Sequence, residues 1–575
     1  MYNLACVWPL TDLTSTMPGT QMLLDQIMLE TGCFDKPCRL QVLDQICRIA
    51  VQPHDSTAEV IEGSSETMSG ALAASSNSKT LLVHDFEESE ASHIEPTESL
   101  RQLCLSHCSL HCLQSLPGVE VLVLWNCSFK TIEKMPNLKA LVIVDTFIRP
   151  EVLAGLLEDA PSIQRLALIR AGDVLCGGKG AGYCFSPSTN PVLFHTRGLN
   201  EIVLQGTLLP RQDLVHNIQA NSKLEKLSIS QTWLPDQYVA WMAHAMGEPT
   251  CNLKDFSIKE VQWSPFASMW LVNGLYRNTG IERLDVSGTL WHPSPRTAFC
   301  HFLQHHAASL EELKLESMVD PSMISAVLDA CNQNCVLKAV TIARNYLECS
   351  AMESLAKLLR HHPSLEEVNL SHCFAGDDTC WADALKGLAS NSSVKSLSLE
   401  KCRIGKPGAI AIGKALAINT TLRSIDLCHN GIDVDGTRAL VEGLEANGTL
   451  QRIFLHGNKD EAESTHLLRD LMRDRNTTLR VVFVPESCLQ EELQYYGALN
   501  FAGRKYVGDT AIPHSLWPTI LVRAVAISPE IAFHLLQEKP DLLIQRSATR
   551  KRPVEEVPED AAVVEAQARS RRRKA

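Results

Sequence analysis

The stretch "NTTLRSIDLCHNGI", Asn419–Ile432, carries apolar residues in the spacing Leu-x-x-Ile-x-Leu. Leu422, Ile425 and Leu427 fill these positions, and the same pattern returns 28 residues later at Leu450. A fixed period of this length predicts one supersecondary unit per repeat, stacked so that each unit buries the apolar face of its neighbour. We therefore compared the whole chain with this pattern.

Fifteen blocks share the pattern. Their first anchors are Leu100, Val119, Leu138, Ile163, Leu199, Leu224, Leu253, Ile281, Leu310, Leu337, Leu365, Val394, Leu422, Leu450 and Leu479. Each block alternates apolar and variable residues, which predicts a strand, and most are followed by apolar residues at helical spacing. The first two steps, of 19 residues each, leave no room for a helix and predict short loops. The step after Ile163 carries a Gly-rich insertion at 171–198, which we expect on the binding side.

Three residues after the last strand anchor, eleven of the fifteen units have Asn, Cys or Thr, as at Asn430. Together with the period, this resembles the leucine-rich repeat family, in its ribonuclease-inhibitor-like subclass. The resemblance implies an α/β solenoid with a curved parallel sheet on the concave side, helices on the convex side and helical ends. It also implies that these Asn, Cys and Thr side chains are buried and bond the backbone of neighbouring coils. We call this row of buried side chains the ladder. Ala171, Val261 and Met318 depart from the pattern, which predicts that the ladder is broken there and that the middle coils are less regular.

The chain divides into five expected segments. These are an N-terminal helical cap (1–51), a flexible Ser/Thr/acidic linker (52–98), the solenoid of about fifteen units (99–487), a C-terminal helical cap (488–545) and a disordered charged tail (546–575). The run "ALNFAGRKYVG" with the later "LWPTILVRA" resembles the closing segment of repeat proteins in diatoms and related algae, and implies no activity.

Composition limits the partners. The net charge of -13 argues against nucleic-acid binding, because phosphates require a basic surface, and it permits a basic protein partner. The start of the chain lacks a signal peptide, and no stretch approaches the roughly 18 apolar residues of a membrane span. We expect no membrane contact, a cytoplasmic location and reduced thiols. The basic clusters Arg550–Arg552 and Arg571–Lys574 leave a nuclear location open.

Two patterns that suggest chemistry have structural explanations. The run "LCLSHCSLHC", 103–112, alternates between strand faces, so its Cys and His side chains do not converge on a metal. "GAIAIGKA", Gly408–Ala415, matches a phosphate loop except at its last residue, but lies in the helical half of a unit. No Ser-His-Asp or Cys-His arrangement can be defended. We therefore predict no enzyme activity, no catalytic residue, no metal and no cofactor.

The Asn-x-Thr triplets at Asn419, Asn447 and Asn476 each precede a strand anchor. A turn at the end of a helix explains this phase, because Asn tolerates a left-handed backbone. The alternative, glycosylation, would require secretion. We predict a turn.

The concave face offers two groups of candidate binding residues. The first is apolar and comprises Val123, Trp125, Val142 and Val144, which are either a binding patch or covered by residues 1–51. The second is acidic and comprises Asp255, Asp285, Glu312, Glu316, Glu367, Glu400 and Asp426, against only Lys259, Arg283 and Lys314. These acids either form a solvated strand face or capture a basic partner.

The expected function is a protein-protein interaction scaffold that binds a protein of unknown identity through its concave face, with no small-molecule substrate. One alternative is a regulator of a small GTPase, because the Ran GTPase-activating protein uses similar repeats, although its acidic carboxyl tail is missing here. A second alternative is a ubiquitin-ligase substrate receptor, although no F-box precedes the repeats. Fold alone does not decide among them.

Overall fold

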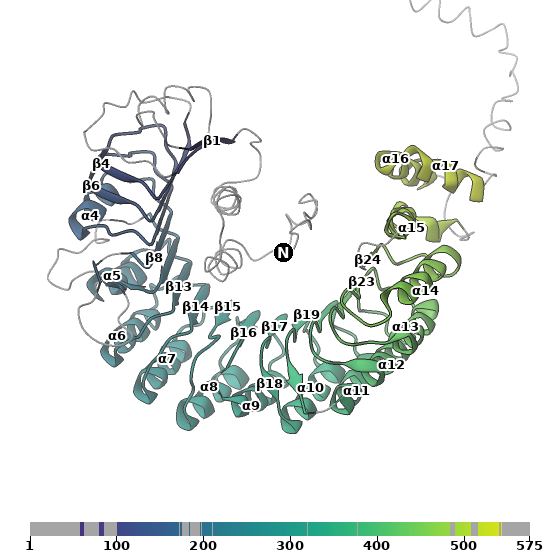
Figure 1. Ribbon diagram of the computed structural model, residues 1–575. Coiled ribbons are helices and arrows are strands. Elements are labelled where there is room, and N and C mark those ends of the chain that lie inside the picture. The colour runs from purple at the N-terminus through teal and green to yellow at the C-terminus, as the bar shows by residue number, and fades with distance from the viewer. Residues whose placement is uncertain are drawn as a thin grey trace, which may run out of the picture.

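The computed structural model describes residues 58–62, 80–84, 100–171, 173–174, 183–184, 196, 198–209, 211–318, 320–376, 378–483, 489–507, 516–539 and 542. Within them, a parallel sheet of seventeen strands lines the inner side of an arc, and helices cover most of its outer side (Figure 1). The fold is an α/β leucine-rich repeat solenoid, as the sequence predicts.

Each strand of the sheet pairs in parallel with the next one along the chain. The strands are β1 (Ala58–Glu62), β2 (Thr80–His84), β3 (Gln102–Ser106), β5 (Val121–Trp125), β7 (Ala140–Val144), β8 (Arg165–Ile169), β11 (Glu201–Gln205), β13 (Lys226–Ser230), β14 (Asp255–Lys259), β15 (Arg283–Asp285), β16 (Glu312–Lys314), β17 (Ala339–Thr341), β19 (Glu367–Asn369), β21 (Ser396–Ser398), β22 (Ser424–Asp426), β23 (Arg452–Phe454) and β24 (Val481–Phe483). All fifteen predicted blocks therefore contain a strand.

The strands β1 and β2 lie inside the segment 52–98 that was expected to be a flexible linker. They extend the sheet beyond β3, with Leu81 opposite Leu103 in the register. Leu81 and Val83 are fully buried. The boundary predicted at residue 99 is thus too late, because two short apolar runs are masked in sequence by the Ser- and Glu-rich composition around them. The remaining residues of 52–98, and the predicted segments 1–51 and 546–575, lie outside the described residues.

The first two coils have no helix, as the 19-residue steps predict, but short strands stand where loops were expected. β4 (Ser109–Leu113) pairs with β6 (Ser128–Ile132) on the outer side. Two pairs of residues from the insertion, β9 (Asp173–Val174) and β10 (Tyr183–Cys184), form a small sheet with β12 (Thr207–Leu208). The remaining residues of the insertion are only partly described.

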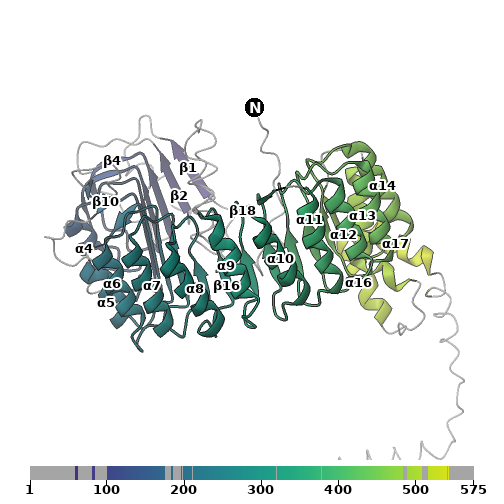
Figure 2. The ribbon, with the colours of Figure 1, turned by 90° about the horizontal axis from the view of Figure 1, so that it is seen from below.

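The later coils carry the predicted helices, which stand side by side along the outer surface in Figure 2. They are α4 (Pro150–Glu158), α5 (Arg211–Ala220), α6 (Asp236–Met246), α7 (Pro265–Arg277), α8 (Pro293–His305), α9 (Pro321–Cys331), α10 (Cys349–His361), α11 (Asp378–Leu385) with the 3-10 turn η1 (Lys386–Ser390), α12 (Gly405–Leu416), α13 (Val434–Ala446) and α14 (Glu461–Asp474). The strand anchors and the inner faces of these helices form one continuous apolar core. Each buried Leu contributes about 1.5 to 3 kcal/mol of transfer free energy.

The predicted ladder of buried side chains is confirmed. Asn345 donates from Nδ2 to the Leu315 carbonyl at 2.7 Å, and Cys402 donates from Sγ to the Leu370 carbonyl at 3.0 Å. The apolar side chains of Ala171, Val261 and Met318 are buried and interrupt the ladder. The strands on both sides keep their register, so the prediction of less regular middle coils is wrong.

The Asn-x-Thr residues do form turns, but the predicted left-handed backbone is wrong. Asn447 has φ -85° and ψ 119°, and neither Asn419 nor Asn476 has a positive φ. All three are buried and bond the preceding coil, as when Asn419 Nδ2 donates to the Leu388 carbonyl at 2.7 Å. They form a second ladder at the helix ends, where burial leaves no room for a sugar.

The far end of the arc is covered by α15 (Gln490–Ala502), η2 (Arg504–Tyr506), α16 (Trp517–Ile527) and α17 (Pro529–Glu538) (Figure 1). These helices have a core of their own, centred on Trp517. Asn500 ties α15 to the solenoid by donating to the Leu479 carbonyl at 2.7 Å. None of the helices that the structure describes combines the length and the apolar character needed to span a bilayer.

Candidate functional site

The concave face is built from side chains one coil apart. Parallel pairing places Asp255, Arg283 and Glu312 side by side at one level of the sheet. At the next level it aligns Ser257, Asp285 and Lys314. Residues about 28 positions apart in sequence are therefore direct neighbours on this surface.

The apolar candidates near the N-terminal end are only partly accessible. Val123 and Val144 are buried, at 1% and 6% exposure, whereas Trp125 and Val142 are half-buried. The Trp125 ring lies 5.8 Å from the ring of His107, centroid to centroid. Among these four residues, Trp125 and Val142 therefore keep surface that a partner could contact.

Three of the central acidic candidates lie beside bases, on a neighbouring coil for Asp255 and Asp285 and on the same strand for Glu312. Lys314 lies 3.0 Å from Glu312, measured from Nζ to Oε1, and Arg283 lies 3.2 Å from Asp255. Lys259 and Asp285 approach to 4.0 Å. The acidic excess that the sequence suggests across this region is therefore largely neutralised locally.

Asp285 is the most enclosed of these carboxylates. Its Oδ1 accepts hydrogen bonds from the Ser287 amide at 3.1 Å and from the Ser287 hydroxyl at 2.6 Å. Burial raises the pKa of Asp285, while Lys259 and the Ser287 hydrogen bonds oppose the increase. Burial, with repulsion from Asp285, also raises the pKa of Glu316. These two carboxylates are held in a desolvated network.

The acids toward the C-terminal end are less neutralised. Glu367 is exposed and, among the described residues, has no ion-pair partner within 4 Å. Glu400 lies 3.3 Å from Lys401. Asp426 is half-buried and accepts the Cys428 amide at 2.9 Å. Burial raises the pKa of Asp426, and the charge of Glu400 adds to that effect.

A second row of residues was missed by the sequence analysis. The residue before each ladder position has a left-handed backbone in fourteen coils, with φ between 47° and 74°. These residues are His107, Asn126, Asp145, Arg170, Gly206, Gln231, Glu260, Gly288, Ser317, Arg344, His372, Lys401, His429 and Gly457. All of their amides except that of Gly457 donate to a backbone carbonyl of the next coil, as His429 does to His456 at 2.8 Å, whereas Gly457 donates to the Glu461 carboxylate. This left-handed turn therefore places the fourteen residues in a row along one edge of the concave face.

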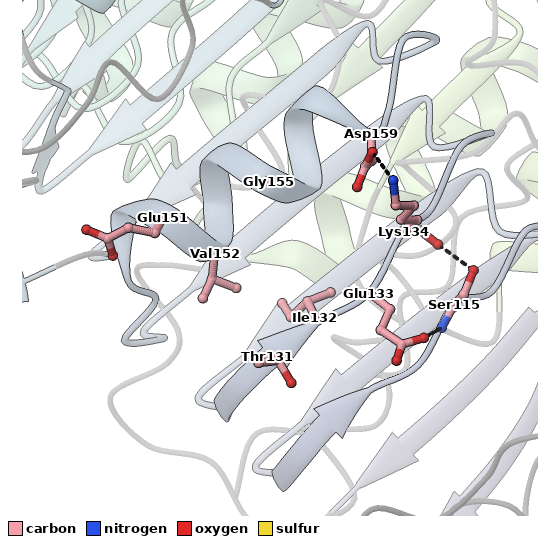
Figure 3. Close-up of a pocket in the computed structure, with 9 residues that line it drawn as sticks. All are labelled: Ser115, Thr131, Ile132, Glu133, Lys134, Glu151, Val152, Gly155 and Asp159. Carbon is pink, nitrogen blue, oxygen red and sulfur yellow. Dashed lines mark hydrogen bonds and ion pairs between the residues drawn. The ribbon is translucent and has the colours of Figure 1, made fainter.

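A shallow cavity of about 550 Å³ lies between β6 and α4 (Figure 3). Its lining residues are Ser115, Thr131, Ile132, Glu133, Lys134, Glu151, Val152, Gly155 and Asp159. Lys134 pairs with Asp159 at 3.0 Å, and Glu133 accepts the Ser115 amide at 3.0 Å. These polar groups tie adjacent coils together.

The patterns that suggested chemistry are structural in the described residues. The Gly408–Ala415 segment lies in α12, where a Cβ added at Gly413 would come within 2.1 Å of the Ala439 carbonyl oxygen. That contact leaves no space for a phosphate. Cys108 lies in the ladder and donates from Sγ to the Ser106 carbonyl at 3.3 Å. No three His, Cys, Asp or Glu side chains in the described ranges could jointly hold a metal ion.

This geometry is that of a leucine-rich repeat solenoid, and the sequence is similar to leucine-rich repeat proteins. A family model described as "Leucine Rich repeat" matches residues 390–413 and 419–441. The matched segments include α12, α13 and the strand β22 that carries Asp426.

Similar proteins are found among leucine-rich repeat proteins of mammals. One is NACHT, LRR and PYD domains-containing protein 14 of Mus musculus, 25% identical over 32% of this chain and 18% of the relative. Another is the Mus musculus ribonuclease inhibitor, 22% identical over 35% of this chain and 44% of the inhibitor. The alignments thus span well under two thirds of either relative. The TLR13-ssRNA13 complex superposes on 74% of this chain with a TM-score of 0.42 and 15% identity.

Proposed function

We propose that this protein is an interaction scaffold that holds a partner protein against its concave face. The observation that carries this proposal is the unbroken register of the sheet from β1 to β24. Seventeen strands about 4.8 Å apart make an inner surface roughly 75 Å long. A surface of that size suits a protein better than a small molecule.

Within this face, the proposed contact centre lies on β19 to β22. Glu367 is exposed there, Glu400 follows the next strand of the sheet, and Asp426 lies in the strand after that. The raised pKa of Asp426 reflects burial beside another carboxylate, so a Lys or Arg of a partner would stabilise its charged form. The proposed partner is therefore basic at this point. Asp255, Asp285 and Glu312 are weaker candidates because bases of this chain already neutralise them.

The similarity to the ribonuclease inhibitor supports a binding role, because that name denotes a protein that acts on another protein. We propose that this chain likewise binds without catalysis, in the cytoplasm or the nucleus, and without a nucleic-acid partner. The likeness of its closing segment to algal repeat proteins also remains a proposal. The GTPase-regulator and ubiquitin-ligase alternatives stay predictions from the sequence.

Proximity labelling in the native cell, with reversed concave charges, tests this function. The variant Glu367→Lys/Asp426→Lys changes two concave acids, and Glu353→Lys/Glu442→Lys makes the same charge change on exposed positions of α10 and α13. We expect the first variant to lose a specific set of labelled proteins that the second retains. Identical labelling by the wild type and both variants would exclude binding at these acids.

A further inference from the structure

One edge of the solenoid carries bases and aromatic rings together. We call the basic-aromatic edge the set Arg344, Tyr346, His372, Phe374, Lys401 and Arg403. Three consecutive coils contribute to it in the same way. Each supplies a base directly before the ladder residue, and a ring or a guanidinium directly after it.

The three residues of this edge that follow the ladder positions are neighbours in space. Tyr346 in β18 (Tyr346–Leu347) pairs with Phe374 in β20 (Phe374–Ala375). The Phe374 amide donates to the Asn345 carbonyl at 3.0 Å, which fixes the two coils in register. On the next coil, Arg403 Cζ lies 5.1 Å from the centre of the Phe374 ring. A ring, a second ring and a guanidinium therefore follow one another across three coils.

This edge is accessible. Tyr346 is 51% exposed and Phe374 is 42% exposed, and Arg344, Lys401 and Arg403 are also exposed. A single exposed ring needs no explanation. Two rings in register, flanked by three cations, form a surface that combines apolar contact area with positive charge.

The cations of this edge lie close to one another. Burial lowers the pKa of His372, and the charges of Lys401, Arg344 and His429 lower it further, against an opposite effect of Glu400. These groups are therefore close enough to act on one imidazole. Glu400 is near Lys401, at 3.3 Å, and Glu348 is the nearest acid further along the Tyr346 coil.

An unbroken run of bases at this position is found only on these coils, because the earlier bases His107 and Arg170 are followed by coils without one. At the same position before the ladder, four of the preceding coils carry Gln231, Glu260, Gly288 and Ser317. These residues are neutral or acidic. The run of bases starts at Arg344, and it continues through His372 and Lys401 to His429.

We propose that the basic-aromatic edge binds an acidic, extended peptide segment of a partner protein. Arg344 and Lys401 stand two coils apart, roughly 10 Å, which is about three residues of an extended polyproline II segment, in which every third side chain lies on the same side. Carboxylates spaced by three residues would meet both cations, and side chains between them would lie on Tyr346 and Phe374. A nucleic acid fits less well, because Glu367, Glu400 and Asp426 lie on the adjoining face. This site adjoins the proposed acidic contact centre through the Lys401–Glu400 pair, but the proposal does not rest on binding at those acids.

The test measures fluorescence anisotropy of the full chain with a labelled (Glu-Gly-Tyr)4 peptide. The comparison probes are (Gln-Gly-Tyr)4 and a 12-nucleotide oligothymidine. The variant Arg344→Glu/Lys401→Glu reverses the edge, and Lys357→Glu/Lys414→Glu makes the same charge change on exposed positions of α10 and α12. Tyr346→Ala/Phe374→Ala removes the rings. If the reversal variant lacks a wild-type thermal transition, Arg344→Gln/Lys401→Gln replaces it.

We expect the wild type to prefer the Glu peptide to both other probes. Changing either the edge cations or the rings should weaken binding roughly tenfold, while the control variant stays within about twofold. No binding of the Glu peptide, equal binding of the Gln peptide, or equal losses in edge and control variants would overturn the proposal. Tighter binding of the oligonucleotide would overturn it in favour of a nucleic-acid site.

Discussion

The Asn430 side chain accepts a hydrogen bond at Oδ1 from the backbone amide of Cys402, 28 residues earlier, at 2.8 Å. The same oxygen accepts the Ile404 amide at 3.3 Å, and Asn430 Nδ2 donates to the Leu399 carbonyl at 2.7 Å. One buried carboxamide thus satisfies three backbone groups of the preceding coil. Because such groups are costly to bury without partners, the ladder stabilises the stacking of coils.

Asn430→Ala should lower the free energy of unfolding by about 2 to 4 kcal/mol, because it leaves the Cys402 amide and the Leu399 carbonyl without these partners. Asn430→Cys should lose less, because Cys402 fills the equivalent place one coil earlier and its thiol bonds the Leu370 carbonyl. Urea unfolding measures both. Asn273→Ala, at an exposed position of α7, should change stability by no more than about 0.5 kcal/mol. Equal losses of unfolding free energy in Asn273→Ala and Asn430→Ala would contradict the stabilising role of the ladder.

His362 takes the place of Asn in the helix-end ladder, and its Nδ1 accepts the Leu365 amide at 3.1 Å. Burial lowers the pKa of His362 below its ordinary value of 6.5. The unfolded chain therefore binds the proton more readily, so stability is highest above pH 6.5 and falls as the pH decreases through the folded pKa. His362→Asn should reduce this loss between pH 7 and 5, because the amide does not titrate. Thermal unfolding across that range checks it, and exposed His361→Asn should keep the wild-type slope.

The helices α12 and α13 touch through glycines. A Cβ added at Gly443 would lie 2.0 Å from the Gly413 carbonyl oxygen, so Gly443→Ala must push the helices apart. We expect a loss of about 2 to 3 kcal/mol in urea unfolding. Gly448→Ala is the matched control, because its Cβ would meet nothing within 4 Å. An unchanged free energy of unfolding for Gly443→Ala would show that this contact is not tight in solution.

The C-terminal cap should open independently of the distant coils, because repeat proteins are stabilised mainly by neighbours. Trp517 is fully buried in the cap, and Trp517→Ala should cost about 3 to 5 kcal/mol of local stability. Hydrogen exchange should then accelerate in α16 and α17 but not in β13 or β14. Phe533→Ala, at a 62% exposed position, should leave exchange unchanged. Faster exchange across the whole sheet would show that the cap and solenoid unfold together.

The sequence identified the acidic side chains of the concave face but not their partners. Asp255, Asp285 and Glu312 appear as an excess of charge when each strand is considered alone. The structure places a base against each of them, from an adjacent coil for Asp255 and Asp285 and from the same strand for Glu312. The basic-aromatic edge was missed for a related reason. Aligning the units on the ladder position, rather than on the strand anchors, would have placed Arg344, His372 and Lys401 in one column.

The sequence by itself determined the repeat, its strands and its buried ladder. Leu422, Ile425, Leu427 and Asn430 have their roles because the 28-residue period places each at the same point of every coil. The tertiary structure decided what the period cannot encode. It placed β1 and β2 in the sheet, kept Asn447 in an extended backbone, and gave the left-handed turn to residues such as His429. Those outcomes depend on hydrogen bonds between coils, which form only when the solenoid stacks.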